Sequence, residues 1–182
     1  MQFVEKKCRY FARYGARNTE GVIEAVLRRL KEGDLRTVIV ASTSGATGLK
    51  FAEALKNKAK VIAVSYQEMR PRIKERILEL GGTVIEKADL PLHKRGMDKV
   101  RNAFYTLGQG FKVAVEVTLI SVDEKVVRLG EEVIGVGGTE KGADTAIVLK
   151  ASSTRKMFSP DPDERLEVKE ILAMPLKKMW WE

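Results

Sequence analysis

The stretch TVIVASTSGAT, residues 37–47, decides the fold of this chain. Its first residues are apolar and mostly β-branched, as in a buried strand, and the small hydroxyl and glycine residues after them are typical of a tight turn. Apolar residues at helical spacing follow over residues 49–55. The stretch therefore predicts a strand, a turn and the N-terminus of a helix in direct succession.

Strand and helix patterns alternate on both sides of this stretch. A continuous apolar run within residues 60–65 is typical of a strand that is covered on both faces. Residues 113–127 contain β-branched residues that favour a strand, but their length without a turn residue favours a buried helix, which we predict. The expected helices cover residues 19–31, 49–55, 71–80, 97–107 and 113–127, and the expected strands cover residues 37–41, 60–65, 83–86, 133–136, 145–149 and, at an edge of the sheet, 166–174.

Alternating strands and helices form βαβ units, in which helices cover both faces of a mainly parallel sheet. We expect a three-layer α/β/α fold of this kind, with an antiparallel strand near one edge. A chain of 182 residues is long enough for one such domain, so we treat residues 1–182 as a single domain. Ligands of these sheets bind outside the carboxyl ends of the strands, where residues 42–47 and 137–142 would meet.

The composition excludes several classes of protein. With 44% hydrophobic and 32% charged residues and no long apolar run, the chain is expected to be soluble, without a membrane span or a secretory signal. Its one cysteine, Cys8, cannot form an internal disulfide, and with one histidine, His93, it leaves no cluster for a metal ion. We therefore expect a cytoplasmic protein without a metal site.

The net charge of +8 leaves a nucleic-acid partner open as an alternative. Basic residues outnumber acidic ones over residues 1–31, and others gather within residues 70–76. They alternate with apolar residues at helical spacing, however, as on any solvated helix face, and no zinc-finger, RNP or GXXG pattern accompanies them. A soluble surface tuned by charge is the favoured interpretation.

The turn at residues 42–47 is the first candidate binding site. Backbone N–H groups at a helix N-terminus, beside the positive end of the helix dipole, bind phosphate groups. The glycine spacing does not match the dinucleotide fingerprint, and the Gly-Lys-Ser/Thr of a Walker A loop is absent from the sequence. The alternative is an ordinary turn in which a serine or threonine caps the helix. We predict a site for one terminal phosphate, made of Ser42, Thr43, Ser44, Gly45, Ala46 and Thr47.

A second glycine-rich loop, residues 135–142, follows a later strand. Either its small residues let a ligand approach the backbone closely, or the loop is only a flexible hairpin connection. Asp144 could accept hydrogen bonds from ligand hydroxyls or merely end the loop. The candidate residues of this loop are Gly135, Gly137, Gly138 and Thr139.

Other residues carry weaker signals. Asn18 and Thr19 could bind a ligand, although capping of the following helix is the simpler role. His93 lies in a predicted loop and is a candidate general base, but a single exposed histidine is more often incidental. Cys8 lies among basic residues, and without a paired base it has little support as a nucleophile.

Two stretches of the chain resemble the C-terminal α/β domain of pyruvate kinase. The first is VIVASTSGAT at residues 38–47 with the strand AKVIAV at residues 59–64, and the second runs from EVIGVGGT at residues 132–139 to ADTAIVL at residues 143–149. The chain is still more similar to stand-alone, mostly archaeal proteins of this fold, which share NTE at residues 18–20 and an ending like EVKEI at residues 167–171. That second resemblance covers nearly the whole chain.

The resemblance implies a pyruvate kinase C-terminal domain-like fold and a site for a phosphorylated ligand. In the kinase, the loop similar to residues 42–47 holds a phosphate of a sugar bisphosphate effector, and the loop similar to residues 135–142 contributes to the same site. The kinase reaction takes place on a (β/α)8 barrel that has no counterpart in this sequence, so we expect no pyruvate kinase activity.

The stand-alone relatives are associated with FMN, which is the cofactor that the resemblance implies. The FMN phosphate would bind residues 42–47, the ribityl hydroxyls would meet Asn18, Thr19 or Asp144, and the flavin ring would lie against residues 135–142. We therefore expect a protein that binds FMN or a related phosphorylated small molecule, with no reaction assigned.

Two alternatives stand beside this expectation. One is a regulatory module that senses a phosphorylated metabolite without catalysis, and the other is the nucleic-acid binder described above. Trp180 and Trp181 near the terminus could dock on the body of the domain or on a second subunit, in a homo-oligomer.

Overall fold

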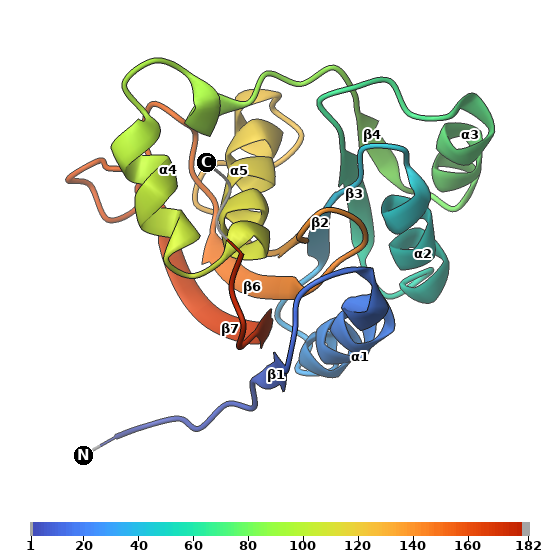
Figure 1. The fold of residues 1–182 in the computed structure, drawn as a ribbon, viewed down its shortest axis with the longest axis horizontal. Coiled ribbons are helices and arrows are strands. Elements are labelled where there is room, and N and C mark those ends of the chain that lie inside the picture. The colour runs from blue at the N-terminus through green and yellow to red at the C-terminus, as the bar shows by residue number, and fades with distance from the viewer. Residues whose placement is uncertain (1, 180–182) are drawn as a thin grey trace.

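The computed structural model of the protein describes residues 2–179, which form a sheet with helices on both faces (Figure 1). The sheet has seven strands in the order β1-β7-β6-β5-β2-β3-β4. The strands are β1 (Arg9–Phe11), β2 (Thr37–Ala41), β3 (Lys60–Val64), β4 (Thr83–Ile85), β5 (Glu132–Gly137), β6 (Thr145–Lys150) and β7 (Glu167–Pro175). The helices are α1 (Thr19–Leu30), α2 (Ala46–Ala54), α3 (Pro71–Glu79), α4 (Asp98–Tyr105) and α5 (Gln109–Asp123), with short 3-10 turns at η1 (Ala16–Asn18) and η2 (Pro91–His93).

Most neighbouring strands of the sheet run parallel. β2 pairs in parallel with both β3 and β5, β3 pairs in parallel with β4, and β1 pairs in parallel with β7. β6 runs antiparallel to its two neighbours, β5 and β7. The expected mainly parallel sheet with an antiparallel strand near one edge is therefore confirmed.

The apolar run of β2 is explained by helices on both sides of the strand. Val38 and Val40 belong to the core cluster that contains the buried residues of α1 and α2. Ile39, which points to the opposite face, belongs to the cluster that contains the buried residues of α5. Figure 1 shows the same division, with α1, α2 and α3 on one side of the sheet and α4 and α5 on the other. The three-layer α/β/α class is confirmed.

Helix α5 packs directly against β5 because glycines remove the side chains between their backbones. A Cβ at Gly137 would lie 2.1 Å from the carbonyl oxygen of Gly110, and one at Gly135 would lie 2.8 Å from that of Ala114. The helix itself is buried along most of its length. The prediction that residues 113–127 form a buried helix is confirmed, although the helix begins four residues earlier and ends at Asp123.

One predicted position in the sheet is wrong. The strand expected over residues 166–174 forms as β7, but it is not at an edge, because β1 pairs with it on its outer side. The short β1 carries too few residues for a strand pattern to be visible in the sequence. Trp180 and Trp181 lie outside the described residues.

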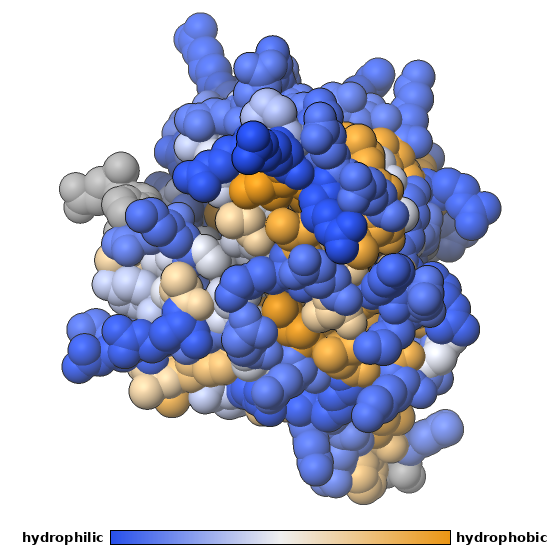
Figure 2. Space-filling model, turned by 90° about the vertical axis from the view of Figure 1, so that its right-hand side faces the viewer, coloured by the Kyte–Doolittle hydropathy of each residue, from blue (hydrophilic) through white to orange (hydrophobic). Residues whose placement is uncertain are grey.

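The side of the molecule on the right of Figure 1 is mostly hydrophilic, with apolar side chains visible between the charged ones (Figure 2). α3 lies on this side, and two of its basic residues are paired: Lys74 with Glu86, and Arg76 with Glu79 at 2.9 Å. Within residues 2–179, none of the helices combines the length and the apolar character that a membrane span requires.

Candidate functional site

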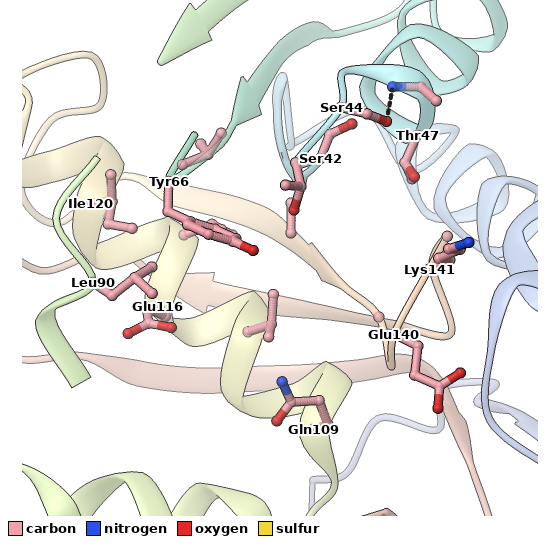
Figure 3. A pocket seen from close by; sticks show the side chains of 18 of the residues that line it. Ser42, Ser44, Thr47, Tyr66, Leu90, Gln109, Glu116, Ile120, Glu140 and Lys141 are labelled. Carbon is pink, nitrogen blue, oxygen red and sulfur yellow. Dashed lines mark hydrogen bonds between the residues drawn. The ribbon is translucent and has the colours of Figure 1, made fainter. Parts of the chain in front are cut away.

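A cleft of about 800 Å³ opens at the carboxyl ends of β2 and β3 (Figure 3). β2 is the strand from which the chain proceeds to β3 and β4 on one side, while β5 lies on the other side. This is the switch in strand order beside which ligands of open α/β sheets bind. The cleft is lined by the turn after β2, by η2, by α5 and by the β5–β6 loop, with Tyr66 and Arg70 from the segment after β3.

The turn after β2 has the geometry of a capped helix start. Gly45 adopts φ +88°, which favours glycine, and a Cβ there would also lie 2.7 Å from Ile73. The Ser42 hydroxyl is buried and accepts a hydrogen bond from the Gly48 N–H at 2.9 Å. The capping role that the sequence left open therefore belongs to Ser42, three residues before the N-cap position.

The other hydroxyls of this turn remain at the surface of the cleft. Thr43 is exposed, and Ser44 and Thr47 are half-buried; all three line the cleft. The Ser44 hydroxyl lies 3.5 Å from the Ala46 N–H, which is a weak contact. The N–H groups of Ala46 and Thr47 belong to the first turn of α2, where no intrahelical acceptor is available. Donors for an anion are therefore grouped at this end of the cleft.

A cationic side chain stands beside the turn. The Arg70 backbone N–H donates to the Ser44 carbonyl at 3.4 Å, which ties the start of α3 to the turn, and the Arg70 side chain is among those that line the cleft. Lys141 lines the cleft from the β5–β6 loop, next to Glu140. The anion-facing end thus has two cations and one carboxylate around it.

The glycines of the second loop have different neighbours from those the sequence suggested. Gly135 and Gly137 lie under α5, so their missing side chains admit a helix rather than a ligand. A Cβ at Gly138 would lie 2.1 Å from the Gly142 carbonyl oxygen, because the loop closes on itself there. Gly138 and Gly142 line the cleft, while Thr139 is buried.

Asp144 holds this loop against the N-terminal part of the chain. Its buried carboxylate accepts hydrogen bonds from the N–H groups of Gly15 at 2.9 Å and Thr139 at 3.1 Å, and from the Thr145 hydroxyl at 2.9 Å. Asp144 does not line the cleft. Of the two roles considered for it, this geometry favours the structural one.

Asn18 and Thr19 belong to the same junction. The Thr19 hydroxyl accepts from the Ala143 N–H at 3.0 Å and donates to the Ala16 carbonyl at 2.7 Å, and the Asn18 amide donates to the Arg13 carbonyl at 2.7 Å. Asn18 occupies the N-cap position of α1 without a side-chain capping bond, so the simpler capping role expected for it is wrong. Neither residue lines the cleft.

The wall opposite the turn contains a charged cluster that the sequence analysis missed. Lys112 and Glu116 are almost fully buried on α5, with the Lys112 ammonium 2.7 Å from the Glu116 carboxylate. His93 Nε2 lies 2.8 Å from the Lys112 Nζ. A signal was present, because a lysine and a glutamate four residues apart interrupt a largely apolar stretch of this helix.

The remaining wall of the cleft is largely apolar. Val113, Val117 and Ile120 of α5 and Leu90 face it, and Tyr66 is half-exposed within it. Figure 3 shows Ser44 and Thr47 at one end, Leu90 and Glu116 at the other, and the Tyr66 ring between them in this view. The lining therefore changes from hydroxyl-rich to apolar across the cleft.

One polar atom in this lining has no partner. The side-chain oxygen of Gln109, at the start of α5, is buried and receives no hydrogen bond from any group within residues 2–179. Leaving such an acceptor unpaired costs about 1–3 kcal/mol. No group of three or more possible metal-binding side chains occurs in the same part of the chain.

A seven-stranded mixed sheet with helices on both faces and a cleft at its switch point defines an open-sheet α/β domain. The family model described as "Pyruvate kinase, alpha/beta domain" matches residues 20–149, which is more than two thirds of the chain. The chain therefore belongs to this family. The match runs from α1 to β6 and includes every residue that lines the cleft.

Proposed function

We propose that this protein binds a phosphorylated small molecule in the cleft, with FMN as the ligand, and that it has no pyruvate kinase activity. The observation that carries the proposal is the change in the cleft lining, from hydroxyls and first-turn N–H groups at the start of α2 to an apolar wall on α5. A cavity of about 800 Å³ is in the size range of small-molecule sites. We also propose a cytoplasmic location, which suits a chain with one cysteine.

The phosphate of the ligand would lie at the start of α2. The hydroxyls of Ser44 and Thr47 and the first-turn N–H groups supply donors, and the positive end of the helix dipole favours an anion there. The Arg70 guanidinium provides a cation beside the same turn. The Ser42 oxygen already accepts the Gly48 N–H, so we assign Ser42 to holding the turn rather than to the phosphate.

The rest of the ligand would extend toward α5. A planar ring would lie against the half-exposed Tyr66 and the apolar side chains Val113 and Val117, all of which line the cleft. Gln109 lines the cleft, and rotation of its side chain would bring the buried, unpaired oxygen to a ribityl hydroxyl and remove its desolvation cost. Asp144 and Thr19 already bond to other parts of the chain, so Gln109 is the better-placed partner for the ribityl hydroxyls.

FMN, when bound, would supply electron or hydride transfer, and no residue is assigned a step in such a reaction. The residues present do the work of binding and orientation. They also restrict water at the apolar wall, because Val117 and its neighbours leave few polar groups there.

The experiment measures FMN binding by quenching of its fluorescence, in wild type and in Thr47→Glu. A carboxylate at residue 47 would face the phosphate, so we expect loss of FMN binding in a folded variant. The matched control is Asn102→Glu, which adds the same charge at an exposed position on α4 outside the cleft lining. Wild-type affinity in a folded Thr47→Glu protein would contradict the assigned phosphate position.

A second measurement separates the proposal from its alternative. FMN should raise the midpoint of thermal unfolding, because a ligand that binds only the folded state stabilises it. Riboflavin, which lacks the phosphate, should produce a smaller rise. A shift with sugar phosphates and none with FMN would favour the metabolite-sensing module, and no binding of FMN by either method would refute the proposal.

A further inference from the structure

Glu116 lies at the end of the cleft away from the start of α2 (Figure 3). It forms a charged cluster with Lys112, which it contacts at 2.7 Å, and with His93, which lies 2.8 Å from Lys112; all three residues line the cleft. Burial of a lysine and a glutamate carries a desolvation cost that well-packed apolar residues in the same space would avoid. The pair is therefore weak evidence for stability. Its position on a wall of the cleft favours a role in ligand binding instead.

Each acceptor atom of this cluster already receives a hydrogen bond from a neighbouring group. One Glu116 carboxylate oxygen accepts the Leu92 N–H at 3.0 Å, and the other accepts from Lys112 at 2.7 Å. The His93 Nε2 atom accepts from Lys112 at 2.8 Å, which places the proton of a neutral imidazole on Nδ1.

Some hydrogen-bond donors of the cluster, in contrast, are not used. The Lys112 ammonium has three N–H groups, of which two are directed at Glu116 and His93, and it lies 5.7 Å from the centre of the Tyr105 ring. The His93 Nδ1 proton has no acceptor within residues 2–179. Unused donors on Lys112 and His93 are suited to an oxygen atom of a ligand.

We propose that His93 and Lys112 form a second subsite of the cleft, which binds an oxygen acceptor, a carbonyl or carboxylate, at the end of the ligand remote from its phosphate. This subsite rests on the proposed phosphorylated ligand. Glu116 is a positioning residue, because it holds Lys112 through one oxygen and the η2 backbone, at Leu92, through the other.

The charges around His93 make it a reporter of this subsite. Burial and the Lys112 ammonium lower the pKa of His93, and Arg101 acts in the same direction, while Glu116 and Asp98 oppose them. The free protein therefore contains neutral His93 at pH 7. A ligand oxygen that accepts from His93 would favour the charged imidazolium and raise its pKa, more for a carboxylate than for a carbonyl.

Because His93 is the only histidine of the chain, its ring gives one unambiguous set of NMR signals. The experiment follows these signals against pH in the free protein, with inorganic phosphate, and with FMN, which carries both a phosphate and ring carbonyls. We expect phosphate to leave the titration of His93 unchanged and FMN to move it upward. The same FMN titration, read by fluorescence, shows whether the ligand is bound.

A variant tests the contact energetically. His93→Ala removes a half-exposed side chain, and we expect it to weaken FMN binding about five- to tenfold, as the loss of one hydrogen bond does, with unchanged binding of inorganic phosphate. His93→Gln, which can still donate and accept, should restore part of the loss. Lys94→Ala, at the exposed neighbouring residue, is the matched control and should bind FMN as wild type does.

The outcomes separate the two proposals. If FMN binds but His93 neither shifts nor matters in His93→Ala, the second subsite is overturned and the phosphorylated-ligand function stands. If phosphate alone moves the titration of His93 as far as FMN does, the two ends are not separate and the subsite is again overturned. If FMN does not bind, the proposed function fails and the subsite fails with it.

Discussion

Replacing Ser42 with alanine removes the hydroxyl oxygen that accepts the Gly48 N–H at 2.9 Å. Both residues are buried, so water cannot take the place of the hydroxyl. The variant therefore loses a helix-capping bond and leaves a buried donor unpaired. Losses of this kind cost about 1–2 kcal/mol.

Thermal unfolding followed by circular dichroism measures this loss. For a chain of this length each kcal/mol lowers the unfolding midpoint by about 2–4 °C, so Ser42→Ala should unfold about 2–8 °C below wild type. Ser44→Ala is the matched control, because its hydroxyl lies 3.5 Å from the Ala46 N–H and contributes little to the turn. We expect its free energy of unfolding to fall by no more than about 0.5 kcal/mol.

The pair of variants also separates the two roles of the turn. Ser44→Ala should weaken binding of a phosphorylated ligand while leaving stability almost intact, and Ser42→Ala should lower stability. If the two variants unfold at the same temperature, the assignment of Ser42 to the helix cap is wrong. If Ser42→Ala is as stable as wild type, the buried bond contributes nothing measurable.

Three further predictions follow from the packing and the charges. Gly137→Ala places a Cβ 2.1 Å from a backbone oxygen of α5. This clash should lower the free energy of unfolding, measured in urea, by about 3 kcal/mol or more. An unchanged urea midpoint would contradict this prediction. The Arg29 guanidinium lowers the pKa of Asp34 from 3.8 to about 2. The Asp34 carboxylate therefore stabilises the folded state above pH 4 and loses that effect as pH falls toward 2. Asp34→Asn should be less stable than wild type at pH 6, and the difference in the free energy of unfolding should shrink by pH 2. Lys112→Met leaves Glu116 buried without its cation and should cost about 3–5 kcal/mol. The double variant Lys112→Met/Glu116→Gln removes the buried charge and keeps an oxygen for the Leu92 N–H, so it should recover most of that loss in the same urea assay.

The predictable part of the fold is the part that local periodicity encodes. Residues 37–47 form a strand, a turn and a helix start because each step is favoured by its own residues, and α5 forms because its length without a turn residue outweighs the β preference of its valines. β1 has no such signal. Its three residues are a strand only because β7, far along the chain, presents an edge to them.

The candidate site likewise has one part that is local in the sequence and one part that depends on tertiary packing. The turn after β2 is local, so its donors could be predicted from the sequence. The cluster of His93 and Lys112 joins η2 to α5, and its spatial proximity depends on how those elements pack. Gly135 and Gly137 show a second limit of prediction from the sequence. A glycine allows close approach of a helix backbone as well as of a ligand, and the sequence does not distinguish the two.

The pairing of β1 with β7 can form only after almost all of the described chain has been synthesised. β1 leaves the ribosome long before its partner β7, whose synthesis ends at Pro175. Until then Gly15 and Thr19, which follow β1, lack a settled position from which to hold Asp144 and Ala143. Domains with such distant pairings fold slowly, since the loop must close before the contacts form. The loop at one rim of the cleft therefore gains these anchors only once the segment after β1 is in place, and we expect a nascent chain that lacks β7 to bind a ligand less tightly than the finished protein.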